Sequence, residues 1–91
     1  MPEVTERLAA RVRRDFPDTA SADDLIRRLG DLTDSERIQS AVVLWAPGDV
    51  AKFSDSIALA AIDWRDVLVR GGLADDGWPA RLDEELGSSE T

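Results

Sequence analysis

The chain contains no cysteine, no histidine and no tyrosine among its 91 residues. The absence of cysteine and histidine excludes disulfides, thiolate chemistry, Cys/His zinc sites and imidazole catalysis. A ferritin-like di-iron site also needs histidine, so it is excluded as well. Few of the side chains that enzymes commonly use remain. We therefore expect a protein that is not an enzyme, with no catalytic residues, no metal and no cofactor.

Long apolar runs are also missing from the sequence. No segment approaches the about 20 consecutive apolar residues of a transmembrane helix, and the first residues lack the apolar stretch of a signal peptide. We therefore expect a cytoplasmic protein. The basic residues are almost all arginine, and alanine and aspartate are abundant. This composition is typical of a high-GC bacterial genome.

Acidic residues outnumber basic ones by 19 to 11, which gives a formal net charge of −8. Phosphate groups are bound by cationic surfaces, so this balance is unfavourable for nucleic acids and for anionic membranes. The helices predicted on either side of Gly30 superficially resemble a helix-turn-helix. However, Asp31 and Glu36 occupy positions where that motif needs apolar packing or a surface that attracts phosphate. We expect no nucleic-acid partner and no membrane partner.

Two groups of carboxylates are candidates for a metal site. Asp55, Asp63 and Asp66 share one predicted helix, and residues 75–77 read Asp-Asp-Gly in a predicted loop. The loop lacks the alternating acids and the distant glutamate of an EF-hand. Neither group predicts a specific metal site.

The chain is long enough and apolar enough to fold as one unit. Hydrophobic residues make up 43% of it, which is sufficient for a core in spite of the net charge. We expect residues 1–87 to form a single helical domain and residues 88–91 to form a disordered tail.

Apolar residues recur at spacings of three and four along most of the chain, and no useful length of it alternates with a period of two. This pattern predicts an all-α protein, a small helical bundle of about five helices. Proline, glycine and capping residues mark where the helices begin and end. The first helix is expected to end at Phe16 before Pro17, the second to run from the Ser21–Asp24 capping box to Gly30, the third to begin at the Thr33–Glu36 capping box, the fourth to run from the Asp49 cap to about Arg70, and the fifth to run from Trp78-Pro79 to Gly87.

The strongest periodic signal lies in residues 50–70. Six apolar residues there alternate in steps of three and four, as on the contact face of a coiled coil, so this helix must pack against another. A short turn at Pro47-Gly48 precedes it, and short turns favour antiparallel neighbours. We therefore expect an antiparallel helical hairpin of the third and fourth helices, with the fourth helix at the centre of the bundle. The six residues are Val50, Phe53, Ile57, Ala60, Trp64 and Val67, and the expected shared core contains Trp45, Phe53, Ile57 and Trp64.

More than half of the circumference of the fourth helix is apolar. At ~1.5 Å per residue this helix would be about 32 Å long, which is more than the third helix, at about 20 Å, can cover. An uncovered apolar flank typically marks an interaction surface. We therefore expect a non-catalytic protein-interaction module or a homodimer. The candidate interaction residues are Leu59, Ile62, Arg65, Asp66, Val69 and Trp78.

A small-molecule-binding protein is the alternative. It would have a pocket lined by Trp45, Trp64 or Trp78, with Arg65 as its one charged contact. Arg65 belongs to the distinctive run Asp63-Trp64-Arg65-Asp66, which either presents the arginine to an anion or packs its stem over the helix surface. A cavity in the fold would favour the small-molecule hypothesis, and a flat apolar patch would favour the interface.

Three segments in the middle of the chain form a recognisable pattern. Residues 37–46 contain an Arg-hydrophobic-Gln helix start, Gly48-Asp49 follows as a turn, and residues 63–68 read Asp-Trp-Arg-Asp-Val-Leu. Together they resemble a group of small uncharacterised bacterial all-helical proteins. The resemblance covers the middle third of the chain, and it implies the helical hairpin but no particular activity.

Overall fold

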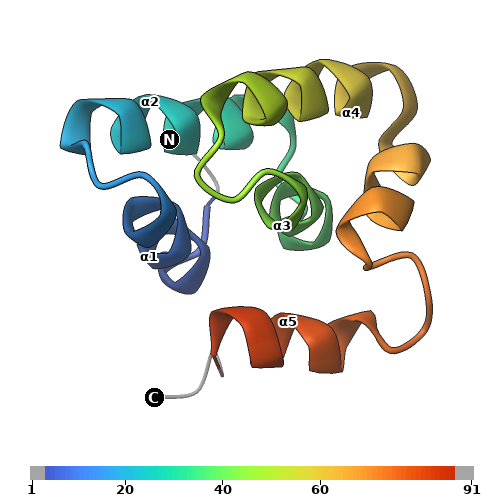
Figure 1. Cartoon of the computed structure of the whole chain (residues 1–91). Coiled ribbons are helices and arrows are strands. Elements are labelled where there is room, and N and C mark those ends of the chain that lie inside the picture. The colour runs from blue at the N-terminus through green and yellow to red at the C-terminus, as the bar shows by residue number, and fades with distance from the viewer. Residues whose placement is uncertain (1–3, 88–91) are drawn as a thin grey trace.

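The computed structural model describes residues 4–87. Within this range the chain forms five helices and no strand, which confirms the prediction of a small all-α bundle (Figure 1). The helices are α1 (Glu6–Asp15), α2 (Thr19–Leu32), α3 (Glu36–Trp45), α4 (Val50–Gly71) and α5 (Trp78–Leu86). The predicted disordered tail, residues 88–91, lies outside the described residues.

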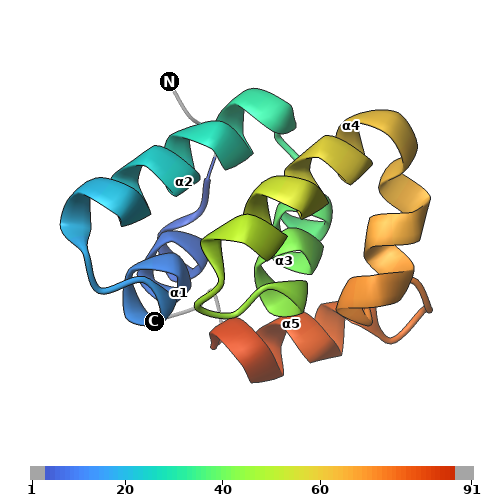
Figure 2. The same ribbon diagram turned by 45° about the horizontal axis from the view of Figure 1, so that its top comes forward.

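Helix α3 is the centre of the bundle. It contacts each of the other four helices, which surround it in Figures 1 and 2. Its residues 39–43 are all buried, so no side of the helix faces solvent along this stretch. The apolar pattern of residues 50–70 favours α4 as the central helix, and the structure shows that this prediction is wrong. A helix that is apolar nearly all round, as α3 is in its last turns, is the one that a bundle encloses.

Helices α3 and α4 form the predicted antiparallel hairpin. The turn between them contains Gly48, whose φ of +74° lies in the region that favours glycine. Phe53 in the first turn of α4 is buried and meets the ring of Phe16 edge-on, with 5.6 Å between the ring centroids. Ile57, one turn later, is half-buried. Trp64 is predicted in the same core, but it is 45% exposed, so this part of the prediction is wrong.

Two helices begin at other residues than the capping patterns predict. The cap of α2 is Asp18, whose carboxylate accepts hydrogen bonds from the N–H of Ser21 (3.1 Å) and from its hydroxyl (2.7 Å). The cap of α3 is Ser35, whose hydroxyl accepts the N–H of Ile38 (3.4 Å). Aspartate and serine are about equally favourable caps, so the local pattern does not decide between neighbouring candidates. Helix α2 also continues through Gly30, which the sequence predicts as its end.

Arg7 joins α1 to α3 and α5. Its guanidinium donates to both carboxylate oxygens of Glu36 (2.7 and 2.9 Å). It also donates to the carboxylate of Asp83 (2.8 Å) and to the carbonyl oxygen of Gly87 (2.8 Å). The carboxylate of Glu36 therefore binds α1 and does not close the predicted capping box with Thr33, whose N–H donates to a carbonyl of α2 instead.

Protonation of Glu36 is expected to weaken this junction. The pKa of Glu36 lies below its usual range, chiefly because Arg7 donates hydrogen bonds to the carboxylate. Such a group stabilises the fold above its unfolded pKa, near 4.3, and this contribution is lost as the pH falls through the lower folded-state pKa. We expect Glu36→Gln to lower the free energy of unfolding by about 1 to 3 kcal/mol at neutral pH. Urea unfolding across the acidic range should then show a smaller loss of stability in the variant than in the wild type.

Glu6→Gln provides a matched control for this measurement. Glu6 is the first residue of α1, as Glu36 is of α3, but it is exposed and takes part in no ion pair within residues 4–87. We expect its replacement to change the free energy of unfolding by no more than about 0.5 kcal/mol. Equal acid sensitivity of the wild type and Glu36→Gln would contradict the stabilising role of the Arg7–Glu36 pair.

Candidate functional site

Helix α4 bends sharply at Asp63. The φ of −147° and ψ of 88° at this residue lie outside the helical region, and its carboxylate accepts the N–H of Arg65 (3.2 Å). This hydrogen bond is that of a helix cap, so Asp63 ends one helical limb and begins another. We call Asp63 the elbow, residues 50–62 the first limb and residues 64–71 the second limb. Figures 1 and 2 show the second limb turning away from the first and running toward α5.

The sequence contains a local signal for the elbow. Asp63 and Asp66 have the spacing of a capping box, with aspartate at both positions. The same spacing of Ser21 and Asp24 predicts the start of α2. Around Asp63, however, the apolar pattern continues across the break and favours one uninterrupted helix to Arg70, and that prediction is wrong.

The second limb packs back against α3. Gly71 lies so close to Ala41 that a Cβ at residue 71 would be 2.6 Å from the Cα of Ala41. The guanidinium of Arg70 stacks over the ring of Trp45, 4.9 Å from its centroid, and forms an ion pair with Asp66 (3.2 Å). The elbow therefore places the second half of α4 against the protein's own third helix. A straight α4 would extend past α3, and the elbow removes that mismatch of lengths.

Three apolar side chains around the elbow are exposed to solvent. Ile62 is 86% exposed and Val69 is 65% exposed, and Trp64 is exposed over nearly half of its surface. Ile62 and Trp64 flank the elbow directly, whereas Val69 lies on the second limb. The guanidinium of Arg65 lies 5.3 Å from the centre of the Trp64 ring, within the range of a cation–π interaction. Among the large apolar side chains of residues 4–87, Ile62 is the most exposed.

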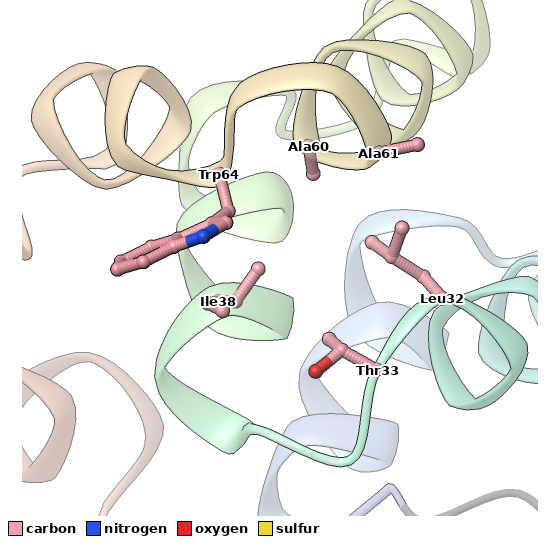
Figure 3. A pocket seen from close by; sticks show the side chains of 6 residues that line it. All are labelled: Leu32, Thr33, Ile38, Ala60, Ala61 and Trp64. Carbon is pink, nitrogen blue, oxygen red and sulfur yellow. The ribbon is translucent and has the colours of Figure 1, made fainter.

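An open groove of about 320 Å³ lies beside the elbow. Its lining comes from the end of α2 and the loop after it, from the first turn of α3, and from both sides of the elbow. The lining residues are Leu32, Thr33, Ile38, Ala60, Ala61 and Trp64. In Figure 3, Ala60 and Ala61 lie across the groove from Leu32 and Thr33, and Trp64 lies above Ile38 at one end.

Five of the six side chains that line the groove are alanine, leucine, isoleucine or tryptophan. The lining contains no titratable side chain, and its one hydroxyl, that of Thr33, accepts the N–H of Ser35 (3.1 Å). No side chain that lines the groove can therefore act as a general acid or base. The side chains of the groove offer apolar contact and a hydrogen-bond donor, the indole N–H of Trp64.

The six candidate interaction residues occupy different environments. Ile62, Arg65 and Val69 are exposed. Leu59 is half-buried and packs against the core, and Asp66 is half-buried and paired with the arginine one turn later. Trp78 lies on α5, away from the other five. Five of the six candidates therefore lie on α4, where Ile62 and Arg65 are exposed on either side of the elbow, and Trp78 lies on another helix.

Only one of the three tryptophans lines the groove. Trp64 does so. Trp45 lies beneath Arg70, and Trp78 lies beneath Arg37, whose guanidinium is 4.9 Å from the centre of the ring. Arg65 is not a lining residue. Nothing in the sequence marks the other five as residues of a groove, because each is an ordinary apolar or small residue of its own segment. The fold alone brings them together.

Within the part of the chain that the structure describes, no group of three or more aspartates and glutamates is placed to hold a metal ion. No helix in that part is both long and apolar enough to cross a membrane. Comparison of the chain with protein-family models, with curated proteins and with solved structures gives no match. The candidate site is therefore defined by its geometry alone.

Proposed function

We propose that the protein is a non-catalytic interaction protein that binds a polypeptide, either a second copy or a different protein, at the elbow of α4. The observation that carries this proposal is the pair of large apolar side chains exposed on the two sides of the elbow, Ile62 at 86% and Trp64 at 45%. A single exposed isoleucine is ordinary on a protein surface. Ile62, however, is only two residues from Trp64, which is exposed and lines the groove, and exposed apolar groups gathered in one region are typical of an interaction site. We call Ile62, Trp64 and the groove the elbow surface.

Burial of the elbow surface by a partner is energetically favourable. Full burial of a side chain such as that of Ile62 contributes about 1.5 to 3 kcal/mol. Tryptophan is enriched among the residues that contribute most to binding at protein interfaces. Trp64 also contacts the guanidinium of Arg65, an interaction worth about 0.5 to 1 kcal/mol at an exposed site.

A small molecule is the second candidate ligand. The groove volume of about 320 Å³ lies at the lower end of the range of about 300 to 1,000 Å³ typical of ligand pockets. Such pockets add a few placed polar groups to their apolar walls. In this groove the polar side-chain groups are the hydroxyl of Thr33, which already accepts a backbone N–H, and the indole N–H of Trp64. An open apolar groove without a charged group suits an apolar side chain of a polypeptide better.

We propose a bacterial cytoplasm as the setting of this protein. Photo-crosslinking in the native organism tests the proposed interaction. A photoreactive amino acid in place of Ile62 is tolerated by the fold because the side chain is exposed. We expect it to form a covalent product with a polypeptide. The same amino acid in place of Ala20, exposed at the start of α2, provides the control. A product made of two copies indicates a homodimer, and sedimentation of the purified protein should then give twice the 10.0 kDa of one chain.

One outcome of the crosslinking experiment would contradict the proposal. If residue 62 yields no polypeptide product beyond those formed from residue 20, the proposal is wrong. A purified protein that binds a small molecule at Trp64 and yields no such product would favour the second candidate.

A further inference from the structure

Helix α4 is interrupted at a single residue, Asp63, the one residue of that helix with non-helical φ and ψ. Sharp bends in helices occur at proline, at glycine or serine pairs, or where a side chain enters the ladder of backbone hydrogen bonds. Residues 59–69 contain no proline, glycine or serine. The carboxylate of Asp63 enters the ladder, because it accepts the N–H of Arg65. In a straight helix that N–H would donate to the carbonyl oxygen of Ala61 instead, so the local sequence is compatible with both forms.

The segment after the elbow, residues 64–87, is held by contacts with the segment before it. The second limb packs on α3, and α5 forms ion pairs with α1. Four apolar side chains of the segment are buried: Val67, Leu68, Leu73 and Leu82. Asp63 is the only covalent connection between the two segments. The same segment from a second copy can therefore make the same contacts.

We infer that two copies of this chain form a dimer by exchanging residues 64–87 across a straightened α4. Each second limb then packs on α3 of the other copy, and each α5 pairs with α1 of the other copy. In Figures 1 and 2 no described segment lies in line with the first limb beyond the elbow, so the straight helix has room. The exchange repeats the contacts of the monomer, so the hinge and new contacts between the copies decide its stability relative to two monomers. The inference does not rest on the proposed function, because the exchanged segment binds α3 and not the elbow surface.

Two exposed side chains supply a contact that the bent monomer lacks. Ile62 is 86% exposed on the first limb, and Val69 is 65% exposed on the second. They are seven residues apart, about two turns of a continuous helix, so a straight α4 carries them on one face. Two-fold symmetry brings the two straight helices together at their hinges, where this face of one copy meets the same face of the other. Burial of these side chains offsets the entropy lost on association.

Two single-cysteine chains detect the exchange directly. The natural chain has no cysteine, and Arg11 of α1 forms an ion pair with Glu85 of α5 (3.4 Å). The variants Arg11→Cys and Glu85→Cys are mixed at high concentration near the midpoint of urea unfolding and returned to native buffer. Physiological salt in that buffer screens the repulsion between chains of net charge −8. A short bismaleimide should then give a covalent dimer of the two variants, because α1 of one chain lies against α5 of the other.

The same two cysteines on one chain provide the control. Crosslinking the double variant Arg11→Cys, Glu85→Cys before the urea treatment ties α5 to its own α1 and blocks exchange. We expect this protein to sediment afterwards as one chain of 10.0 kDa, whereas the uncrosslinked double variant dimerises. A mixture of the single-cysteine chains that stays in native buffer throughout should give much less covalent dimer, because exchange requires the second limb and α5 to open.

Substitution of Asp63 tests the hinge. Asp63→Ala and Asp63→Gly both remove the carboxylate that caps the second limb. Alanine favours a continuous helix and is a poor cap, whereas glycine disfavours the helix and caps almost as well as aspartate. Each dimer contains two hinges, so we expect Asp63→Ala to raise the association constant about a hundredfold and Asp63→Gly to leave it within about fivefold of the wild type. Sedimentation equilibrium after the urea treatment measures both constants, and circular dichroism establishes that both variants are folded.

Three results would overturn the inference. The first is a monomeric Asp63→Ala variant together with no covalent dimer of the single-cysteine chains. The second is an equal association constant for the two Asp63 variants, which would show that α4 does not straighten at the hinge. The third is dimerisation of the crosslinked double variant, since that dimer would form without exchange. In each case photo-crosslinking from residue 62 decides the proposed function separately.

Discussion

Replacement of Phe53 by alanine is expected to lower the free energy of unfolding by about 3 to 5 kcal/mol. Phe53 is fully buried in the first turn of α4, and its ring meets that of Phe16 at 86° with 5.6 Å between centroids. The substitution removes apolar contacts and leaves a cavity between the hairpin and the end of α1. Domains are typically stable by about 5 to 15 kcal/mol, so the variant would lose a large share of the total. Urea unfolding monitored by circular dichroism measures the change.

Ile62→Ala is the matched control for Phe53→Ala. It shortens a large apolar side chain on the same limb of α4, but at a position that is largely exposed. We expect a change of no more than about 0.5 kcal/mol. A loss below about 1 kcal/mol for Phe53→Ala, or a similar loss for both variants, would show that the core does not depend on Phe53 in this way.

Replacement of Gly71 by alanine is expected to destabilise the protein by about 3 kcal/mol. Alanine normally favours a helix over glycine by about 1 kcal/mol, so helix propensity alone predicts the opposite sign. The packing decides the outcome, because the added Cβ would lie 2.6 Å from both the Cα and the carbonyl oxygen of Ala41. These are backbone atoms of the central helix, and they cannot turn aside as a flexible side chain would. Urea unfolding gives the loss, and amide hydrogen exchange should show reduced protection in the second limb.

Gly77→Ala separates this packing effect from the general effect of replacing glycine. Gly77 has a φ of −83°, which alanine adopts without strain, and an added Cβ would approach only the carboxylate of Asp75, at 3.4 Å. We expect a loss of no more than about 1 kcal/mol, because Gly77 caps α5 and alanine is a poorer cap than glycine. If Gly71→Ala were as stable as Gly77→Ala, the second limb would not be packed tightly against α3.

The helix boundaries that the sequence predicts correctly depend on residues a few positions apart. The carboxylate of Asp49 accepts the N–H of Lys52 (3.0 Å) and begins α4, as its position after the turn predicts. Gly72, with a φ of +77°, caps the other end of the same helix. The prediction that α5 begins at Trp78 and ends before Gly87 is also confirmed. In each case the atoms that fix the boundary are near neighbours in the sequence.

The boundaries that the sequence predicts wrongly depend on distant residues. The capping box of Thr33 and Glu36 has the correct spacing, but the carboxylate of Glu36 binds Arg7, 29 positions away in the chain. The elbow is another boundary that the local sequence does not predict, because the apolar pattern continues from one side of Asp63 to the other. The bend depends on the contact of the second limb with α3. The spacing of residues within 50–71 carries no information about that contact.

The candidate site was predictable only in part for the same reason. Ile62 and Trp64 are prominent in the sequence because they are large apolar residues next to charged ones. The groove beside Trp64 needs residues from three segments, and Leu32, Ile38 and Ala61 carry no feature that marks them in advance as its lining. A pattern along one helix predicts which residues face away from the core, but it does not predict which residues of other helices lie beside them.

The contact of Arg7 with Gly87 has a consequence for the course of the whole chain. One guanidinium of α1 reaches a carbonyl oxygen 80 positions later, so the first turn of α1 lies within the reach of one arginine side chain from the end of α5. Joining such ends by a short linker closes a small loop, which has a low entropic cost. The fold is thus suited to circular permutation, and to insertion as a whole into a surface loop of another protein.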